Sequence, residues 1–317
     1  MMKRVVSVWI VLLTIPPLAN AQSRAVAISV DDLPFATGST PEVASTADAT
    51  VAEKVNKKIL CGLARHHAPA IGFLIEQRAE QLGATTSDRI LRQWLKPGFD
   101  LGNHFYSHAD VNKLTMEQVE QEIIGGEKTL QPLLASLSRK PEYLRFPYNH
   151  TGDTPEKRDA IAAFLAGRGY RLAPCTIENS DWEFNWAYAR ALRLKDRKTA
   201  ARIRREYLAY TATMIDWYSG VNKKVLGREP TEVMLLHDSQ LNADTIDEVL
   251  TLFEKRGYRF VSLADALKDP AYPVPETYVS PYGPMWGYRW ARERGVKLDT
   301  RDEPRVPAWV QEYEAGR

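Results

Sequence analysis

The stretch Gly102-Asn103-His104-Phe105-Tyr106-Ser107-His108 carries two histidines four positions apart. On a helical turn, side chains at this spacing project from the same face, so both imidazoles can point to one place. Neutral imidazoles are common ligands of divalent metals, and a histidine pair needs a third ligand, usually a carboxylate. The candidate lies far upstream, in the pair Asp31-Asp32. Taken alone, the two histidines are equally well explained as solvent-facing or core residues.

Around this stretch, short apolar runs alternate with longer helical segments. The run at 25–30, Ala-Val-Ala-Ile-Ser-Val, is typical of a buried parallel strand. Further strands are predicted at 71–75, 99–105, 142–148, 170–177, 232–237 and 258–263. Helices are predicted at 46–66, 87–95, 115–130, 154–167, 184–225 and 245–255. The alternation predicts an α/β fold with a parallel sheet and helices outside it, either a barrel or an open sheet.

Composition and the N-terminus indicate an exported globular protein. The chain has 317 residues, a net charge of +2 and 44% hydrophobic residues, so nothing indicates a nucleic-acid partner. Lys3-Arg4, the apolar run at 5–15 and Ala19-Asn20-Ala21 predict a signal peptide over residues 1–21. An uncleaved membrane anchor is the alternative. No later segment is apolar enough to span a bilayer, and the pattern leaves periplasm and full secretion open.

Residues 22–269 are expected to form one main domain. From residue 270 onward prolines punctuate a stretch rich in tyrosine and tryptophan, which predicts that 270–317 form an extension packed on the main domain. In an oxidising compartment Cys61 and Cys175 could pair, and two separate buried thiols are the alternative. The oligomeric state is left open.

Polar clusters follow five of the predicted strands. In barrels and in open parallel sheets, reactive residues collect at the C-terminal ends of strands. The clusters are Asp31-Asp32, His104 with His108, Arg145-Phe146-Pro147-Tyr148, Glu178-Asn179-Ser180-Asp181-Trp182 and His237-Asp238. We therefore expect these side chains to meet at one end of the sheet.

The order and content of these clusters resemble the NodB-like polysaccharide deacetylase family of metal-dependent carbohydrate esterases, over about residues 26–267. The resemblance is carried by the His-x-x-x-His segment with its preceding Gly-Asn, by Arg-x-Pro-Tyr at 145–148, and by the paired aspartates, Asp181-Trp182 and Leu235-x-His237. It implies a distorted (β/α)7-type barrel. Leu33-Pro34 follows the aspartates where many members have glycine, and this departure alters the rim of the cleft.

The resemblance implies one divalent ion held by Asp32, His104 and His108, with zinc favoured and cobalt, nickel or manganese left open. The ion would activate a water molecule that attacks the acetyl group, and Asp31 would be the general base. Arg145 would orient this base, and the backbone N–H of Tyr148 would stabilise the oxyanion.

The same resemblance implies that His237 is the general acid, tethered by Asp181, and that Trp182 and Leu235 form a wall for the acetyl methyl group. Plain core packing is the alternative for both apolar residues. In the C-terminal extension, Trp286 and Trp290 are candidates to roof or narrow the groove.

The expected function is hydrolysis of N-acetyl groups on an amino-sugar polysaccharide or oligosaccharide. One alternative is an O-acetyl esterase, or another small-amide hydrolase, that uses the same residues. The other is a catalytically silent glycan-binding relative. The acid expected at His237 favours an amide, because an amine leaves poorly unless it is protonated.

Overall fold

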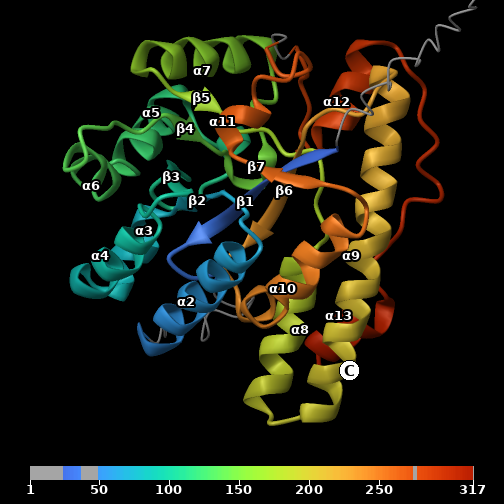
Figure 1. Cartoon of the computed structure of the whole chain (residues 1–317). Coiled ribbons are helices and arrows are strands. Elements are labelled where there is room, and N and C mark those ends of the chain that lie inside the picture. The colour runs from blue at the N-terminus through green and yellow to red at the C-terminus, as the bar shows by residue number, and fades with distance from the viewer. Residues whose placement is uncertain (1–23, 37–48, 274–276, 317) are drawn as a thin grey trace, which may run out of the picture.

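A computed structural model describes residues 24–36, 49–273 and 277–316, and Figure 1 shows its arrangement. A seven-stranded parallel sheet runs in the order β5-β4-β3-β2-β1-β6, with β7 also paired to β1. The strands are β1 (Ala25–Leu33), β2 (Ala70–Leu74), β3 (Phe99–Asn103), β4 (Tyr143–Leu144), β5 (Arg171–Leu172), β6 (Glu232–His237) and β7 (Arg259–Val261). The protein has an α/β fold whose parallel sheet is curled into a half-barrel, which confirms the predicted fold class.

Helices pack around this sheet (Figure 1). They are α2 (Ala49–Arg65), α3 (Glu76–Leu82), α4 (Ala84–Gln93), α5 (Met116–Gly125), α6 (Leu130–Ala135), α7 (Pro155–Arg168), α8 (Asp181–Arg193), α9 (Arg197–Leu226), α10 (Gln240–Glu254), α11 (Leu263–Ala266), α12 (Trp286–Glu293) and α13 (Ala308–Glu314). Of these, α12 packs on α9 and α13 packs on α8. Two short 3-10 turns lie at Val111–Lys113 and Pro147–Asn149. Figure 1 shows α2 beside α10, and α9 as the long helix along one flank of the sheet.

Strand β1 is central and completely buried, and its two faces differ. Val26, Ile28 and Val30 pack into the large apolar core shared with the outer helices. Successive side chains of a strand point to opposite faces, so the other face carries small residues, with Ala27 in a separate cluster on the inner side. The same alternation sends Asp31 to the inner face of the half-barrel. The alternation along β1 therefore determines on which face of the sheet the candidate site residues lie.

Most predicted elements are present, although their bounds differ. The strands expected at 142–148 and 170–177 keep only two ladder residues each. Pro147 starts a 3-10 turn, and the chain after Leu172 crosses to β6, where Ile177 forms an isolated bridge with Met234. The helix expected at 115–130 ends at Gly125, and a new helix, α6, contains Pro132 in its first turn. Proline is tolerated there because the first N–H groups of a helix have no intrahelical partner.

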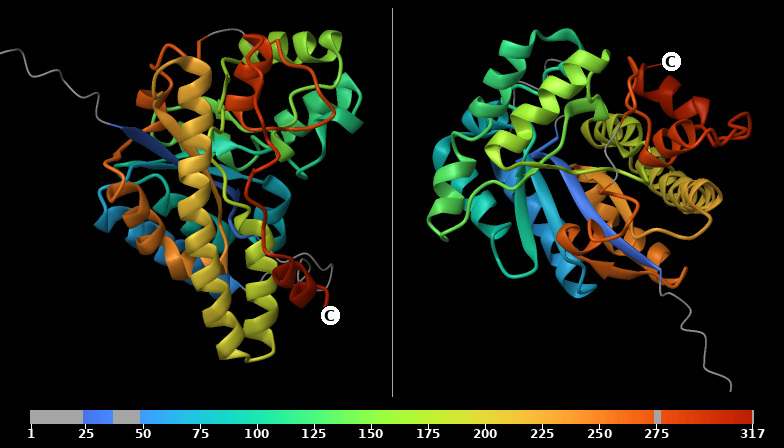
Figure 2. Two further views of the ribbon diagram at one scale, coloured as in Figure 1. Left: turned by 90° about the vertical axis from the view of Figure 1, so that its right-hand side faces the viewer. Right: turned by 90° about the horizontal axis from the view of Figure 1, so that it is seen from above.

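The C-terminal residues run along α8 and α9, as the left view of Figure 2 shows. The Trp286 N–H donates to the carbonyl oxygen of Cys175 at 2.8 Å, and Trp217 Nε1 donates to the hydroxyl of Tyr288 at 2.8 Å. Farther along, the guanidinium of Arg202 lies 3.7 Å from the ring centre of Trp309. These contacts join the segment to the sheet and its helices, while the boundary at residue 270 stays a prediction.

The structure tests part of what the sequence predicts about the cysteines and about membrane-spanning segments. Both cysteines are free, and Cys175 is buried as expected. Cys61 is exposed, so the expectation of two buried thiols is wrong for this residue. The predicted signal peptide, residues 1–21, lies outside the described residues. Within the described residues, none of the helices has the length and apolar character needed to cross a membrane.

Candidate active site

The histidine stretch is a loop and not a helical turn, so this part of the sequence interpretation is wrong. His104 follows directly on β3, and both Phe105 and His108 have left-handed backbones, with φ of 69° and 63°. The imidazoles nevertheless meet, with ring centres 5.0 Å apart. The left-handed residues turn the chain back on itself, which brings the second ring to the first without a helix.

Two polar side chains hold this loop in place. Asn103 accepts a hydrogen bond from the Phe105 N–H at 2.8 Å and donates to the Ile123 carbonyl oxygen at 2.9 Å. Ser107 donates to Glu122 through both its N–H and its hydroxyl, at 2.8 and 2.7 Å. The Asn and Ser of the motif therefore fix the loop to α5, and they do so from outside the site. Position 126 must be glycine, since a Cβ there would lie 2.4 Å from Asn103 Oδ1.

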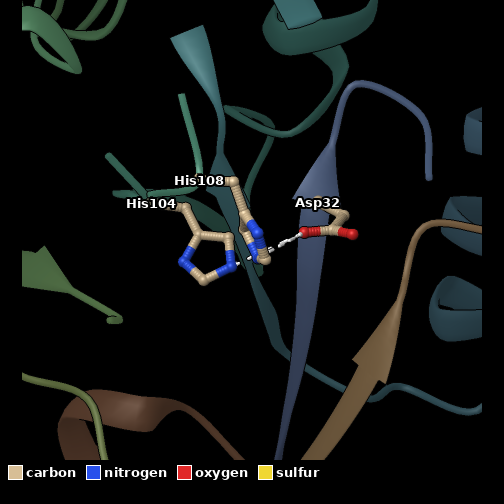
Figure 3. A group of neighbouring side chains, drawn as sticks. All are labelled: Asp32, His104 and His108. Carbon is tan, nitrogen blue, oxygen red and sulfur yellow. Dashed lines mark ion pairs between the residues drawn. The ribbon is translucent and has the colours of Figure 1, made fainter. Parts of the chain in front are cut away.

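Three side chains converge at the C-terminal edge of the sheet, as Figure 3 shows. Asp32 Oδ1 lies 3.6 Å from His104 Nε2 and 3.5 Å from His108 Nε2. One ligand atom from each of these residues lies within 4.8 Å of the other two. The prediction that a carboxylate from the first strand meets the histidine pair is confirmed.

The donor atoms of this triad fit a divalent ion. His104 Nδ1 lies 2.8 Å from the Arg145 carbonyl oxygen, which can only accept, so Nδ1 carries the hydrogen and Nε2 presents its lone pair. Burial lowers the pKa of both His104 and His108 to about 4, which keeps them neutral near pH 7. Asp32 Oδ1 is buried and has no hydrogen-bond partner among the described residues. An unpartnered buried carboxylate oxygen beside two bare imidazole nitrogens is the chemistry of a metal site.

Asp32 is ionised in this setting. Burial opposes its charge, but the positive charges of Arg78 and of His237 lower its pKa well below the usual range. Arg78 Nη1 lies 2.9 Å from Asp32 Oδ2, so one carboxylate oxygen is paired and the other, Oδ1, faces the histidines. Sequence reasoning missed Arg78, because α3 is a short helix without any motif that links it to residue 32.

Asp31 and Arg145 form a buried pair beside the triad. Arg145 is 1% exposed and places Nη1 3.3 Å from Asp31 Oδ2. Its other N–H groups donate to the Ala173 carbonyl oxygen at 2.8 Å and to Ser29 Oγ at 3.1 Å, which locks the guanidinium. Burial raises the pKa of Asp31, and the charge of Arg145 only partly offsets this. The carboxylate therefore has a higher proton affinity than an ordinary aspartate.

His237 and Asp181 form a second pair on the other side of the triad. His237 Nδ1 lies 2.6 Å from Asp181 Oδ1, and the His237 N–H donates to Asp181 Oδ2 at 2.7 Å. Burial disfavours the imidazolium, but Asp181 outweighs it and raises the pKa of His237 to about 10. Asp181 is the first residue of α8, and its second oxygen also accepts from Asn242. The histidine is thus held protonated and in one orientation.

These groups open into one pocket of about 1000 Å³. Trp182 and Leu235 line it, with Trp182 39% exposed, so core packing alone does not account for the tryptophan. Tyr148 also lines the pocket and has a left-handed backbone, with φ of 59°. The expectation that Trp286 and Trp290 roof or narrow the groove is wrong, because both pack into an apolar cluster with Val225. The pocket is instead lined by other residues of the extension, namely Gly283, Pro284, Met285, Tyr288, Thr300 and Glu303.

The structure therefore brings the predicted site residues close together. A model of the polysaccharide deacetylase family matches residues 19–163, which include Asp31, Asp32 and the histidine pair. Over this stretch, which is less than half of the chain, the sequence is similar to the polysaccharide deacetylase family.

Two curated relatives show how far the likeness extends. A peptidoglycan-N-acetylglucosamine deacetylase from Bacillus cereus is 23% identical over 228 residues, which cover 70% of this chain and 66% of the relative. A chitin deacetylase from Arthroderma benhamiae is 30% identical over 94 residues, covering 30% of this chain and 23% of the relative. The matched part thus spans two thirds or less of these two enzymes.

Solved structures support the fold. A CE4 family pseudoenzyme from Bacillus anthracis superposes with a TM-score of 0.51 at 13% identity, covering 78% of this chain and 66% of that one. A mutant of the same pseudoenzyme with restored enzymatic activity gives 0.51 at 15% identity, covering 78% and 68%. At these identities the likeness shows the fold alone.

Proposed function

We propose that this protein is an exported, metal-dependent hydrolase that removes N-acetyl groups from an amino-sugar oligosaccharide or polysaccharide. The observation that carries the proposal is that Asp31 and His237, a candidate base and a candidate acid, lie on adjacent strands beside the triad of potential metal ligands. Asp31 and His237 are partners in the register of β1 and β6, and Asp32 follows Asp31 directly. The similarity to a peptidoglycan-N-acetylglucosamine deacetylase and to a chitin deacetylase favours an N-acetylated amino sugar as the substrate.

Asp32, His104 and His108 would hold the ion. A divalent ion at this place supplies a Lewis acid that polarises the acetyl carbonyl and lowers the pKa of water. Three protein ligands leave coordination positions open, as catalytic sites do. The donor set suits zinc, and cobalt, nickel or manganese would also fit it.

The chain's own residues would then move the protons. Asp31 takes the proton of the attacking water, and its raised pKa suits this role because a base needs proton affinity. Arg145 holds the Asp31 carboxylate in place, and the N–H of Tyr148 stabilises the oxyanion. His237, kept protonated by Asp181, donates a proton to the leaving amine.

The acetyl group would sit beside Trp182 and Leu235. Both side chains line the pocket that contains the triad, and Leu235 comes from the same strand as His237. An apolar wall at this point favours a methyl group over a longer polar substituent. This assignment accounts for a large tryptophan that lines the cleft instead of being fully buried.

The test is release of acetate by the zinc-loaded chain from chitooligosaccharides and from acetylated xylan. We expect release from the chitooligosaccharide, and Asp31→Asn should abolish it while leaving the zinc content near normal. The matched control is Asp299→Asn, the same change at an exposed aspartate in the C-terminal segment. Release from xylan alone would favour the O-acetyl esterase, and binding without release would favour a silent relative. Turnover retained by Asp31→Asn would contradict the mechanism.

A further inference from the structure

The pocket extends from the triad to a wall that the mechanism does not use. This tyrosine–glutamate wall consists of Glu178, Tyr218, Tyr288 and Glu303, all of which line the pocket. Glu178 precedes α8, Tyr218 lies on α9, and the other two belong to the C-terminal segment. The wall therefore exists only because that segment packs along α9.

The wall has more hydrogen-bond acceptors than donors. The Tyr218 hydroxyl lies 3.1 Å from Glu178 Oε1 and 3.5 Å from Glu303 Oε1. A phenol carries a single hydrogen, so Tyr218 can serve only one of these two oxygens at a time. The other hydroxyl of the wall, Tyr288, accepts from Trp217 and has its single hydrogen available for Glu303. Glu178 Oε2 accepts from the Ser180 N–H at 2.7 Å, which leaves Oε1 as the atom that competes for Tyr218.

The cations of the pocket are each paired with an aspartate and not with a glutamate of this wall. Among the described residues that line the pocket there is one arginine, Arg78, which is paired with Asp32, and no lysine. The protonated His237 is paired with Asp181. Burial raises the pKa of Glu178 despite its hydrogen bonds from Ser180 and Tyr218. A cationic donor that entered the pocket would supply both the hydrogens and the charge that the two carboxylates lack.

Aromatic rings give the same compartment the character of a sugar site. Trp182 and Trp186, one helical turn apart on α8, form an edge-to-face pair with ring centres 4.6 Å apart, and both line the pocket. Tyr218 and Tyr288 form a second such pair, at 6.0 Å. Trp182 is 39% exposed, whereas Tyr218 is buried, so the tryptophan pair is the one that offers ring surface to a ligand. Such rings pack against apolar ligand surfaces and attract cations, while carboxylates accept from N–H and O–H groups.

We propose that the tyrosine–glutamate wall is a subsite for an amino sugar with a free, protonated amine, next to the sugar that loses its acetyl group. An ammonium has three hydrogens to donate, and Glu178 Oε1, Glu303 Oε1 and the Tyr218 oxygen lie together as acceptors. The position relative to the reacting sugar rests on the proposed function. The consequence is a preference for partly deacetylated chains over fully acetylated ones.

The experiment measures binding to the full chain in the zinc-loaded Asp31→Asn form, so that ligands are not consumed. Calorimetry compares a glucosamine trimer, an N-acetylglucosamine trimer and cellotriose at low and high salt. We expect Glu303→Gln to weaken the glucosamine trimer about tenfold, to change cellotriose little, and to remove most of the salt dependence. The matched control is Glu312→Gln, at an exposed glutamate of α13, which should behave as the parent does.

Two results would overturn the subsite. One is equal, salt-independent binding of the three trimers by the parent chain, a measurement that does not depend on whether any variant folds. The other is unchanged charge selectivity in a folded Glu303→Gln protein. Failure of the proposed function looks different, because the native chain would then release no acetate while still binding the glucosamine trimer selectively.

Discussion

Replacing Asp181 with asparagine tests the pairing on which the proposed acid depends. In the native chain the Asp181 carboxylate is 2% exposed and lies 2.6 Å from His237 Nδ1. The difference between the ordinary pKa of 6.5 and the value of about 10 corresponds to roughly 5 kcal/mol in favour of the imidazolium. Loss of one close opposite charge should lower the pKa of His237 by about 1 to 3.

The same change has a signature in stability. A histidine with a raised folded pKa stabilises the fold below its unfolded pKa of 6.5, and this contribution disappears as the pH rises through about 10. The free energy of unfolding of the native chain should therefore be higher than that of Asp181→Asn, and the difference between the two should be larger at low pH. We expect this gap to narrow by roughly 1.4 to 4 kcal/mol between about pH 6 and about pH 10. A pH-independent loss of about 1 to 3 kcal/mol remains, because asparagine has one acceptor oxygen for several donors.

Three measurements follow these effects. Proton NMR of the metal-free chain gives the pKa of His237, and urea unfolding across the pH range gives the free-energy gap. With active protein, the alkaline limb of the kcat/KM profile should move to lower pH in the variant, because the acid loses its proton sooner. A native His237 that titrates near 6.5, or a pKa unchanged by Asp181→Asn, would refute the reasoning.

Three further substitutions have defined outcomes. His104→Ala should weaken zinc binding at least about a hundredfold in competition with a chromogenic chelator, and native affinity would remove this histidine from the ligand set. Arg145→Met leaves Asp31 buried without its cation, so urea unfolding should show a loss of about 3 to 5 kcal/mol, and a loss below about 1 kcal/mol would contradict the pairing. In Gly283→Ala the new Cβ would lie 1.9 Å from the Tyr148 carbonyl oxygen, so the C-terminal segment must shift. Melting temperature should fall and KM should rise, whereas an unchanged KM would mean that this segment does not shape the cleft.

The sequence predicted the sheet and the strand-end clusters well because β1 and β6 are continuous apolar runs with polar residues at their ends. It predicted that His104 and His108 meet, but for the wrong reason. Their spacing of four suits a helical turn, and the same convergence arises here from left-handed residues in a loop. Sequence spacing alone does not distinguish these two geometries, since the loop is fixed by contacts with Glu122 on the following helix, α5.

What sequence reasoning missed depends on contacts between distant segments. Arg78 reaches Asp32 because α3 is bonded to the histidine loop, with the Gln77 N–H donating to the Tyr106 carbonyl oxygen at 2.8 Å. Likewise Tyr288 and Glu303 enter the pocket only once α12 packs on α9. By residue type, Trp286 and Trp290 are the stronger candidates to line the pocket, yet both are buried in an apolar cluster that anchors the segment.

The in-register pairing of Asp31 with His237 sets how this architecture can diversify. The distance between the proposed proton acceptor and the proposed proton donor is determined by the ladder of two adjacent strands, and it does not depend on the length of any loop. If the proposed function holds, insertions or exchanges in the C-terminal segment would alter which substrate is admitted without moving these two residues apart. A one-residue change in the register of β1 and β6 would separate Asp31 from His237. Mutations that change specificity and mutations that abolish the proposed chemistry would therefore fall in different parts of the chain.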